Sequence, residues 1–532
     1  MTDTNWLKAI FDSWNSKATT TFVLHGNTSD IFLGKTEELS LKNYIVEKAG
    51  ERGIVLHADP ASGITIEAGS QELADFDPSK LRDGPVMENL HRILLSLSNE
   101  DKIFAPVVFI SNPAYLVGKQ NDARGALLLK RWSEDPHFRK DRPFIVLLAD
   151  SLKELHPVVD NCQRIEKAEV PFPSTADIHE FLTRQLKRYP EAIEGTLTDA
   201  ARDRFVNSLT GTSLQNLDAL IKKQAYLKKP LRLDDLEAIK QKLVAQESHG
   251  MIEFLPTKQT LEDLDGEHMT AIKERIESDL ILWKEGQTHL IPNGILFVGP
   301  PGTGKTFFMR CLAGTAAKYG IPIVKINNFR GEFQGETEGN LELIFRLIRT
   351  LKFVIIFIDE ADQSMGSRDQ GRGDSGVSSR VYSAFAQEMS NTDFKGSRIW
   401  ALATSHPHLL EPDIKRPGRI DVKIPLLPCE DAKSGERLLK QIATRSKFPV
   451  DGALTQIPEL LTPGAATIII EEAIRRYAKG KSEETNTATV QQVLNGFQPP
   501  DPQKMDELTE MAVRESTSTD FVPKAFRDRY QL

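Results

Sequence analysis

The sequence predicts the α/β fold class, with two parallel-sheet cores that are each followed by a small helical lid. Short apolar runs rich in β-branched residues alternate with amphipathic stretches over residues 20–173, and the alternation restarts after residue 262. Each alternating block is followed by a stretch of helical patterns without strand candidates. Alternation of this kind is typical of parallel sheets covered by helices.

The strand candidates are short and bounded by turn-forming residues. In the first block they are TTFVLHG, GIVLHA, APVVFIS, PFIVLLAD and RIEKAEV, and in the second they are GILFVG, IPIVKI, FVIIFI, RIWALAT and DVKIPL. The helical stretches that follow are DIHEFLTRQLKRY, DAARDRFVNSL, SLQNLDALIKKQAYL and LDDLEAIKQKLVAQ, and later SGERLLKQIATRS, ATIIIEEAIRRYAKG, TVQQVLNG and KMDELTEMAVRES.

A chain of 532 residues is too long for a single hydrophobic core, so the patterns are divided into domains. The predicted divisions are a first α/β core at 1–173, its helical lid at 174–248, a linker at 249–262, a second α/β core at 263–428, its helical lid at 429–497 and a C-terminal helical extension at 498–532. Gly and Pro interrupt both periodicities in the linker.

The composition favours a soluble, cytoplasmic globular protein. The hydrophobic content is 40%, the charged content is 27% and the net charge is −8, which gives no footprint for nucleic acid. Cys162, Cys311 and Cys429 are too far apart for a CxxC metal site and are odd in number, which argues against a disulfide framework. The N-terminus shows no secretory signal and no apolar run approaches the roughly 20 residues that span a bilayer, so no membrane partner is expected.

The second block contains a phosphate-binding loop. The segment GPPGTGKT lies between a predicted strand and a predicted helix, which is the context that this motif requires. Its glycines let backbone N–H groups turn toward phosphates, and the helix that follows adds its positive N-terminal end. We expect Lys305 to reach the β- and γ-phosphates and Thr306 to hold Mg²⁺. The expected nucleotide-binding residues are Gly299, Pro300, Pro301, Gly302, Thr303, Gly304, Lys305, Thr306 and Phe307.

Two acids end the strand FVIIFI downstream of this loop. Asp359 is expected to support Mg²⁺ and Glu360 to polarise the attacking water. Acids also end strands as simple turn residues, but the phosphate loop upstream favours the catalytic interpretation. In the segment KRPGRID, Arg416 and Arg419 are candidates for arginines that sense the γ-phosphate, the alternative being surface charges around a Pro-Gly turn.

In this order and spacing, GPPGTGKT, IDEAD, LATSHP and KRPGRID resemble the classical AAA family of ATPases over about residues 260–478. The resemblance implies two P-loop NTPase-like cores, ATP and Mg²⁺ as cofactors, and a homo-oligomeric ring, usually a hexamer. It also implies that Arg416 and Arg419 act on the nucleotide of the neighbouring subunit. Adenine contacts are implied for Leu264, Asp265 and Gly266 before the first helix, and for Gly464 and Ala465 in the lid.

The same resemblance places a pore loop at GEFQGE, with Phe333 in the aromatic position and Gln334 in the apolar one. The polar Gln334 departs from the family pattern, and the alternative is that Phe333 is an ordinary half-buried loop aromatic. A second departure is Ser405, which stands where the family has an Asn that orients water. Serine reaches less far, so we expect slower turnover or assistance from His406.

The first block resembles a degenerate AAA core. The strand APVVFISN ends on Ser111 and Asn112, where FVIIFIDE carries its two acids, and the segment HGNTSDIF has no Gly-Lys-Thr. Overall the chain is similar to the plastid- and cyanobacteria-type tandem AAA proteins, in which an inert module precedes an active one. The alternative is an unrelated α/β domain with buried strands.

The resulting hypothesis is a ring ATPase that remodels, unfolds or disassembles a protein partner, with the first module serving assembly or docking. The alternatives are an ATP-dependent switch or scaffold without threading, and a motor stimulated by nucleic acid. Two other classes are disfavoured. A helicase of the D-E-A-D class needs a second RecA-like domain, which the mainly helical segment after Asp421 does not provide. A metalloprotease needs HExxH, and the only His-Glu pair, His179-Glu180, lacks the second His.

Overall fold

The computed structural model divides the chain into two compact units. Unit 1 comprises Met1–His249 together with Arg330–Thr350, and unit 2 comprises Gly250–Phe329 and Leu351–Leu532. The structure describes residues 5–50, 54–68, 85–98, 105–119, 121, 123–136, 138, 143–192, 206, 209–231, 236–264, 266–331, 336–351, 353–365, 377–479 and 485–532.

Unit 1 is built on a six-stranded sheet in the order β5-β4-β6-β7-β1-β8. All neighbouring strands are parallel except the edge strand β5, which runs antiparallel to β4. The bounds are β1 (Thr21–Gly26), β4 (Val55–Asp59), β5 (Gly63–Ala68), β6 (Val107–Ser111), β7 (Phe144–Ala149) and β8 (Ile165–Val170), with a separate hairpin of β2 (Ile31–Leu33) and β3 (Glu38–Ser40).

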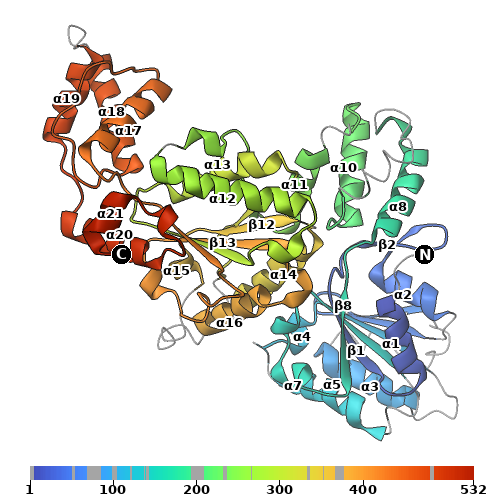
Figure 1. Cartoon of the computed structure of the whole chain (residues 1–532). Coiled ribbons are helices and arrows are strands. Elements are labelled where there is room, and N and C mark those ends of the chain that lie inside the picture. The colour runs from blue at the N-terminus through green and yellow to red at the C-terminus, as the bar shows by residue number, and fades with distance from the viewer. Residues whose placement is uncertain are drawn as a thin grey trace. The chain divides into compact units, whose positions relative to one another are not determined.

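Helices cover both faces of this sheet, which explains why its central strands β6 and β7 are apolar almost throughout. In β6, Val107 and Phe109 pack into a core with helices α1 and α2, whereas Val108 and Ile110 pack into a second core with α3 and α5. Figure 1 shows these helices on the two sides of β1. The bounds are α1 (Asn5–Asn15), α2 (Leu41–Ala49), α3 (Val86–Ser98), α4 (Ala114–Val117), α5 (Arg124–Glu134) and α7 (Pro157–Asp160).

The helical lid of unit 1 follows the sheet, with α8 (Thr175–Arg188), α10 (Leu214–Leu227) and α11 (Leu236–Glu247). Ser174 caps α8 in a capping box with Asp177, and Ser213 caps α10. The predicted helix DAARDRFVNSL falls largely outside the described residues.

Unit 2 repeats this architecture with a sheet in the order β14-β10-β13-β12-β11-β9. Its strands β10, β12 and β13 are buried along their whole length. The bounds are β9 (Ile252–Phe254), β10 (Gly294–Val298), β11 (Ile323–Ile326), β12 (Val354–Ile358), β13 (Arg398–Thr404), β14 (Val422–Pro425), α12 (Glu267–Lys284), α13 (Lys305–Ala317), α15 (Ala361–Ser364) and α16 (Val377–Met389).

The lid of unit 2 and the C-terminal segment are helical. In the lid, Asp431, Thr462 and Thr485 cap the three helices through their side chains. The C-terminal segment contributes to the main core, because Phe521 is buried in the same apolar cluster as Phe297 and Phe308. The bounds are α17 (Ala432–Arg445), α18 (Pro463–Ala478), α19 (Asn486–Gly496), α20 (Pro502–Glu515) and α21 (Lys524–Tyr530).

The two sheets share one topology. If the five parallel strands of each unit are counted along the chain, both sheets have the spatial order fifth, first, fourth, third, second, with an antiparallel edge strand beside the second. The turn after the third strand also matches, since Asn112 has φ +50° and Glu360 has φ +47°. This correspondence is what the prediction of a degenerate first core requires.

The predicted α/β class with two parallel-sheet cores is confirmed, and two of the predicted segments differ in the structure. The segment predicted as a linker contains β9, which pairs antiparallel with β11, and it contains Leu261, which is buried in the core of unit 2. Helix α14 (Glu336–Thr350) was expected within the second core, but its contacts cluster with unit 1. Among the described residues, no helix is long and apolar enough to cross a membrane.

Candidate active site

The phosphate-binding loop connects β10 to α13 and depends on its glycines. Gly302 and Gly304 have φ values of +84° and +86°, in the left-handed region that other residues rarely adopt. At Gly299, a Cβ atom would collide with the backbone carbonyl of Leu426, the residue directly after the neighbouring strand β14. The sequence GPPGTGKT therefore folds into this loop because glycine stands where the backbone is left-handed or closely approached.

The ammonium of Lys305 lies at the centre of the loop. It donates to the carbonyl oxygens of Gly299 at 2.7 Å and Pro300 at 3.1 Å, and to the hydroxyl of Ser405 at 2.8 Å. Burial lowers the pKa of Lys305 to about 8, although the neighbouring carboxylates act in the opposite direction. All three of these acceptors are uncharged, so an anion at this position would stabilise the ammonium better than they do.

The two acids after β12 take different positions. Asp359 accepts a hydrogen bond from the Thr306 hydroxyl at 2.9 Å and lies 3.5 Å from the ammonium of Lys325 on β11. Glu360 is exposed and left-handed, with φ 47° and ψ 52°, and its side chain borders the same cavity. The arrangement holds one carboxylate beside the loop hydroxyl and leaves the other open to solvent.

The end of β13 brings further polar groups to this edge. The Thr404 hydroxyl donates to Asp362 at 2.6 Å and accepts from the backbone N–H of His406 at 2.9 Å. These bonds fix the turn that presents Ser405 to Lys305. The His406 ring lies 3.8 Å from Asp362, so its nearest carboxylate is structural rather than one of the two expected catalytic acids.

The lid of unit 2 closes one side of the site. The backbone N–H of Gly464, in the first turn of α18, donates to the carbonyl of Gly302 at 2.9 Å. A Cβ on Gly464 would lie 3.2 Å from the Cα of Gly302, which is tighter than ordinary contacts. From α17, the Arg445 guanidinium donates to the backbone carbonyl of Asp263. The lid therefore contacts both the phosphate loop and the turn before α12.

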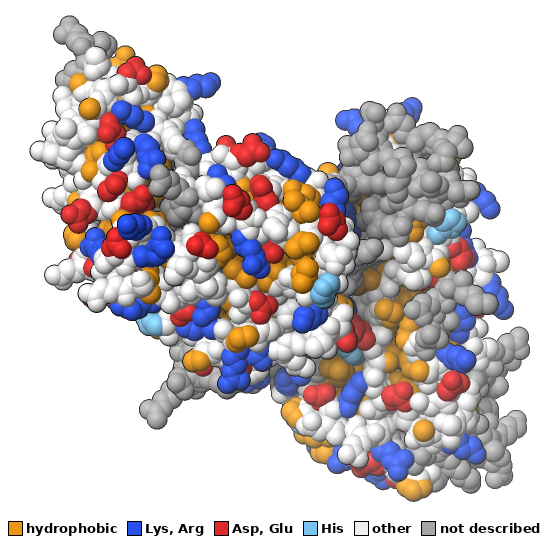
Figure 2. All heavy atoms as spheres, in the orientation of Figure 1, with side chains coloured by type: hydrophobic (Ala, Val, Ile, Leu, Met, Phe, Trp, Pro, Cys, Tyr) orange, Lys and Arg blue, Asp and Glu red, His pale blue; other side chains and the backbone are white. Residues whose placement is uncertain are grey.

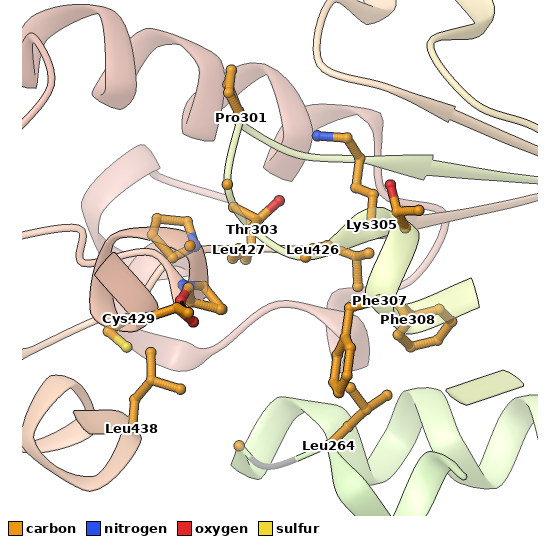
Figure 3. Close-up of a pocket in the computed structure, with 18 of the residues that line it drawn as sticks. Leu264, Pro301, Thr303, Lys305, Phe307, Phe308, Leu426, Leu427, Cys429 and Leu438 are labelled. Carbon is orange, nitrogen blue, oxygen red and sulfur yellow. Dashed lines mark hydrogen bonds between the residues drawn. The ribbon is translucent and has the colours of Figure 1, made fainter. Parts of the chain in front are cut away.

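Together these elements enclose a cavity of about 1150 Å³. Figure 3 shows Phe307 and Leu264 pointing toward one another on the core side, and Cys429 and Leu438 lying close together on the lid side. Burial raises the pKa of the Cys429 thiol to about 12, so this side chain is apolar lining. The predicted site residues that line the cavity are Leu264, Gly266, Pro301, Gly302, Thr303, Gly304, Lys305, Thr306, Phe307, Asp359, Glu360, Ser405 and Gly464.

The remaining predicted residues lie elsewhere. Gly299 and Pro300 form the start of the loop and present carbonyls to Lys305 without lining the cavity. Ala465 is half-buried, with its N–H bonded to the Thr462 hydroxyl. Asp265, Phe333 and Gln334 lie outside the described residues.

The two arginines of KRPGRID do not line the cavity of their own chain. Both bind Asp413, Arg416 at 2.9 Å and Arg419 at 2.6 Å. The Arg416 side chain is 72% exposed, whereas that of Arg419 is 20% exposed and also donates to Ser390. The hydrogen bond from Arg419 holds the pKa of Asp413 below its usual range. Arg416 is thus the one presented to solvent.

Three contributors to the site were missed by the sequence analysis. They are Lys325 beside Asp359, Asp362 beneath Thr404 and Arg445 from the lid. Lys325 could have been found from the sequence, because it is a single charged residue within an otherwise apolar strand. Nothing in the local sequence of α17 marks Arg445, because an arginine in the last turn of a helix is common.

The geometry fits a nucleoside polyphosphate. The left-handed loop glycines, the half-buried ammonium with uncharged acceptors and the N-terminus of α13 provide an anion cradle. The apolar side chains of Leu264, Phe307 and Leu438 provide a surface for a planar base.

The corresponding edge of unit 1 has different groups. Ser111 hydrogen-bonds His57 of β4 at 2.8 Å, and Asn112 donates to Asp59 at 2.9 Å. In register, His57 pairs with Phe109 as Lys325 pairs with Phe357, each two residues before Ser111 or Asp359. The two residues that replace the acids are therefore tied to the neighbouring strand.

Comparison with known proteins agrees with this division. Residues 295–427 match the family "ATPase family associated with various cellular activities (AAA)", and residues 4–171 match "AAA+ chaperone, N-terminal Rossmann-like domain".

Similar curated proteins are AAA proteins. An ATP-dependent zinc metalloprotease FtsH from Paraburkholderia phymatum is 30% identical over 220 residues, which are 39% of this chain and 34% of that relative. The ATPase family gene 2 protein of Saccharomyces cerevisiae is 36% identical over 159 residues, 29% of this chain and 20% of the relative. Peroxisomal ATPase PEX6 of Arabidopsis thaliana is 28% identical over 200 residues, 37% of this chain and 21% of the relative.

The chain thus spans about a third or less of the length of these relatives. The two family matches fall on different sheets, one on the sheet that carries the phosphate loop and the other on the sheet without it, and the first match also includes α14. The chain therefore carries an AAA ATPase domain preceded by an AAA+ chaperone N-terminal domain.

Proposed function

We propose that unit 2 binds ATP with Mg²⁺ and hydrolyses it to ADP and phosphate. The observation that carries this proposal is the convergence of Lys305, the Thr306–Asp359 pair and the exposed Glu360 on one cavity. A hydroxyl beside a carboxylate is the donor set that Mg²⁺ takes next to phosphates, and the metal would supply charge neutralisation of the β- and γ-phosphates.

Each of these residues has its own role in ATP binding and hydrolysis. Lys305 and the loop N–H groups hold the phosphates, and Thr306 and Asp359 hold the metal. Glu360 polarises the attacking water, because its carboxylate is held next to the phosphate loop by the left-handed turn. Ser405 is within hydrogen-bonding distance of Lys305 and orients groups around the γ-phosphate, with the shorter reach of a hydroxyl.

The oligomer is part of this proposal. Arg416 is exposed and lies outside the cavity of its own chain, so it is available to a neighbouring copy. A homo-oligomeric ring, a hexamer by resemblance to the AAA family, would place each Arg416 at the nucleotide of the next subunit. Such an arginine contributes roughly 10³–10⁵ in rate when correctly placed.

For the ring as a whole we propose ATP-driven remodelling, unfolding or disassembly of a protein partner, with unit 1 serving assembly or docking. The support is the AAA+ chaperone description of the N-terminal match and the names of similar proteins, which include an ATP-dependent protease and a peroxisomal ATPase. The alternative is an assembly switch that binds nucleotide and moves no partner.

The nucleotide assignment predicts that Lys305→Ala weakens the binding of the nucleotide. Loss of a half-buried ammonium from the phosphates should weaken affinity at least about tenfold, since charge-assisted hydrogen bonds are the strong ones. Lys318→Ala, at the end of the same helix, is the matched control because its side chain is 54% exposed and pairs only with Glu262 among the ion pairs of the described residues. Calorimetric titration with MgADP measures both, and equal affinities would contradict the assignment.

The lowered pKa of Lys305 predicts a pH dependence of binding. Phosphate stabilises the ammonium, so binding takes up a proton when the free site titrates near pH 8. Affinity should therefore fall as the pH rises through 8, by roughly eightfold between pH 7.5 and pH 9. Titrations with MgADP at the two pH values, in buffers of different ionisation enthalpy, measure the shift and the proton uptake. A flat profile would show that Lys305 keeps its proton throughout.

Remodelling by threading predicts a separate effect of Phe333→Ala. The aromatic side chain would grip an extended partner in the pore and takes no part in hydrolysis, so phosphate release should stay within about twofold while partner processing is lost. The partner used is whatever protein a Glu360→Gln ring retains in ATP. If that partner is still processed at the wild-type rate by Phe333→Ala, the threading mechanism is wrong and the switch is favoured.

A nucleic-acid motor is the third possibility. Figure 2 shows Lys and Arg side chains interspersed with Asp and Glu on the visible face, without a single basic patch on the residues coloured there. Phosphate release measured with and without DNA or RNA tests it, and stimulation by either would favour the motor.

A further inference from the structure

The edge of the unit 1 sheet where β1 and β7 end is acidic. Asp150 and Glu154 follow β7, Glu169 lies in β8, and Glu247 ends α11. Burial, together with the charges of Asp150 and Glu342, raises the pKa of Glu154 to about 7. In unit 2 the equivalent edge carries the half-buried ammonium of the phosphate loop, so the two edges favour ligands of opposite charge.

Another carboxylate of unit 1 strengthens this contrast between the two sheet edges. Asp30, in the loop after β1, accepts hydrogen bonds from the N–H groups of Leu214 at 3.1 Å and Gln215 at 2.8 Å, at the N-terminus of α10. In unit 2 the loop after β10 meets the N-terminus of α18 through Gly302 and Gly464 instead. The N–H groups that would attract a phosphate are thus already bonded to a carboxylate in unit 1.

Helix α14 occupies this edge. The Ser151 hydroxyl donates to Oε2 of Glu342 at 2.7 Å, and Nδ1 of His25 lies 3.4 Å from its Oε1. Burial raises the pKa of Glu342, but the bonds from His25 and Ser151 and the charge of Arg346 outweigh it, so the net pKa is lowered. Glu342 is therefore held as a carboxylate by residues at the ends of β1 and β7.

Arg346, one turn further along α14, inserts its guanidinium beside the end of β1. It lies over the ring of Phe172, 5.1 Å from the centroid, and against Gly26, where any Cβ would collide with it. Burial lowers the pKa of Arg346, and Glu169, Glu342, Glu247 and Asp150 oppose that shift. A phosphate loop cannot occupy a position that a half-buried arginine and its carboxylates already fill.

Along the chain, α14 lies between the expected pore loop and the expected catalytic acids. The helix begins at Glu336, directly after the segment that carries Phe333. It ends at Thr350, four residues before β12, the strand that leads to Asp359 and Glu360. One helix thus joins the expected pore loop to the expected catalytic acids and is itself bound in unit 1.

We propose that the acidic edge of unit 1 is a receptor for Glu342 and Arg346 of α14, and that it transmits the nucleotide state of unit 2 to unit 1. The inference rests on the proposed function, because it assumes that unit 2 responds to ATP. Where unit 2 has an anion cradle, this edge of unit 1 holds the guanidinium of Arg346, and the ligand is a segment of the same chain.

Hydrogen–deuterium exchange on full-length Glu360→Gln protein, with and without MgATP, tests the proposal. In the parent, MgATP should slow exchange in α13 and change exchange in residues 143–156 of unit 1 by at least about threefold. Arg346→Ala should abolish the change in 143–156 and leave that in α13. Glu342→Gln is a second variant of unchanged size, and it should reduce the same response.

Arg188→Ala is the matched control, since Arg188 forms an exposed ion pair with Glu38 in the same unit at 2.7 Å. It should retain both responses. If α13 responds in the parent and residues 143–156 do not, the transmission is wrong while ATP binding stands. The same conclusion follows if residues 143–156 respond equally in the parent and in all variants. If α13 itself does not respond, both the proposed function and this inference fail.

Discussion

Replacement of Glu360 by Gln is expected to reduce phosphate release by about 10²–10⁴-fold while ATP still binds. Gln keeps the size of the side chain and its position in the left-handed turn, but it cannot take a proton from water. Binding should persist because Lys305, Thr306 and Asp359 make their contacts without Glu360. The expected result is a protein that holds ATP without hydrolysing it.

Steady-state phosphate release and MgATP titration, measured on the same preparation, check this expectation. Glu471→Gln serves as the control, because Glu471 is a 57% exposed carboxylate of the same unit on α18. Turnover of Glu360→Gln at the wild-type rate would remove the catalytic role from this residue. Loss of both binding and turnover would indicate a damaged fold instead.

Arg416→Ala is the second change of large effect, with an expected loss of about 10³-fold or more in phosphate release. This corresponds to at least roughly 4 kcal/mol of transition-state stabilisation. Nucleotide affinity of the isolated chain should be unchanged, because Arg416 does not line its own cavity. Arg416→Lys should also fail, since the compact ammonium cannot reproduce the planar guanidinium fork.

Mixing distinguishes action in trans from action within one chain. Arg416→Ala subunits have an intact phosphate site, and Lys305→Ala subunits have an intact Arg416. Mixtures of the two variants should recover part of the ATPase activity that each variant lacks alone. Phosphate release measured at a series of mixing ratios checks this. If mixtures stay inactive at every ratio although the subunits co-assemble, the arginine acts in cis or not at all.

The sequence was sufficient for the parallel strands and insufficient for the antiparallel strand at one edge of each sheet. Runs such as VVFIS and VIIFI are buried on both faces, so their composition alone marks them as central parallel strands. β5 was missed because none of its residues is buried, and β9 was missed because it is only three residues long and carries a glutamate. Their pairing is decided by the neighbouring strand rather than by their own composition.

The site divides in the same way. Residues of the phosphate loop and Asp359 were predictable because their chemistry needs particular residue types at fixed spacing. Lys325, Asp362 and Arg445 were not, because each acts through a partner on another element, and only the fold brings the two together. The binding of α14 in unit 1 was hidden for the same reason, since Glu342 and Arg346 read as the polar face of an ordinary amphipathic helix.

The left-handed conformation of Glu360 lowers the stability of the fold at a residue that ATP hydrolysis is expected to need. A left-handed residue other than glycine or asparagine costs about 1 kcal/mol, and Asn112 avoids much of that strain at the matching turn of unit 1. A library randomised at position 360 and selected only for survival of heating should therefore accumulate Asn and Gly. The survivors would melt later than the parent and release phosphate far more slowly, so selection for heat resistance at this position removes the carboxylate that hydrolysis needs.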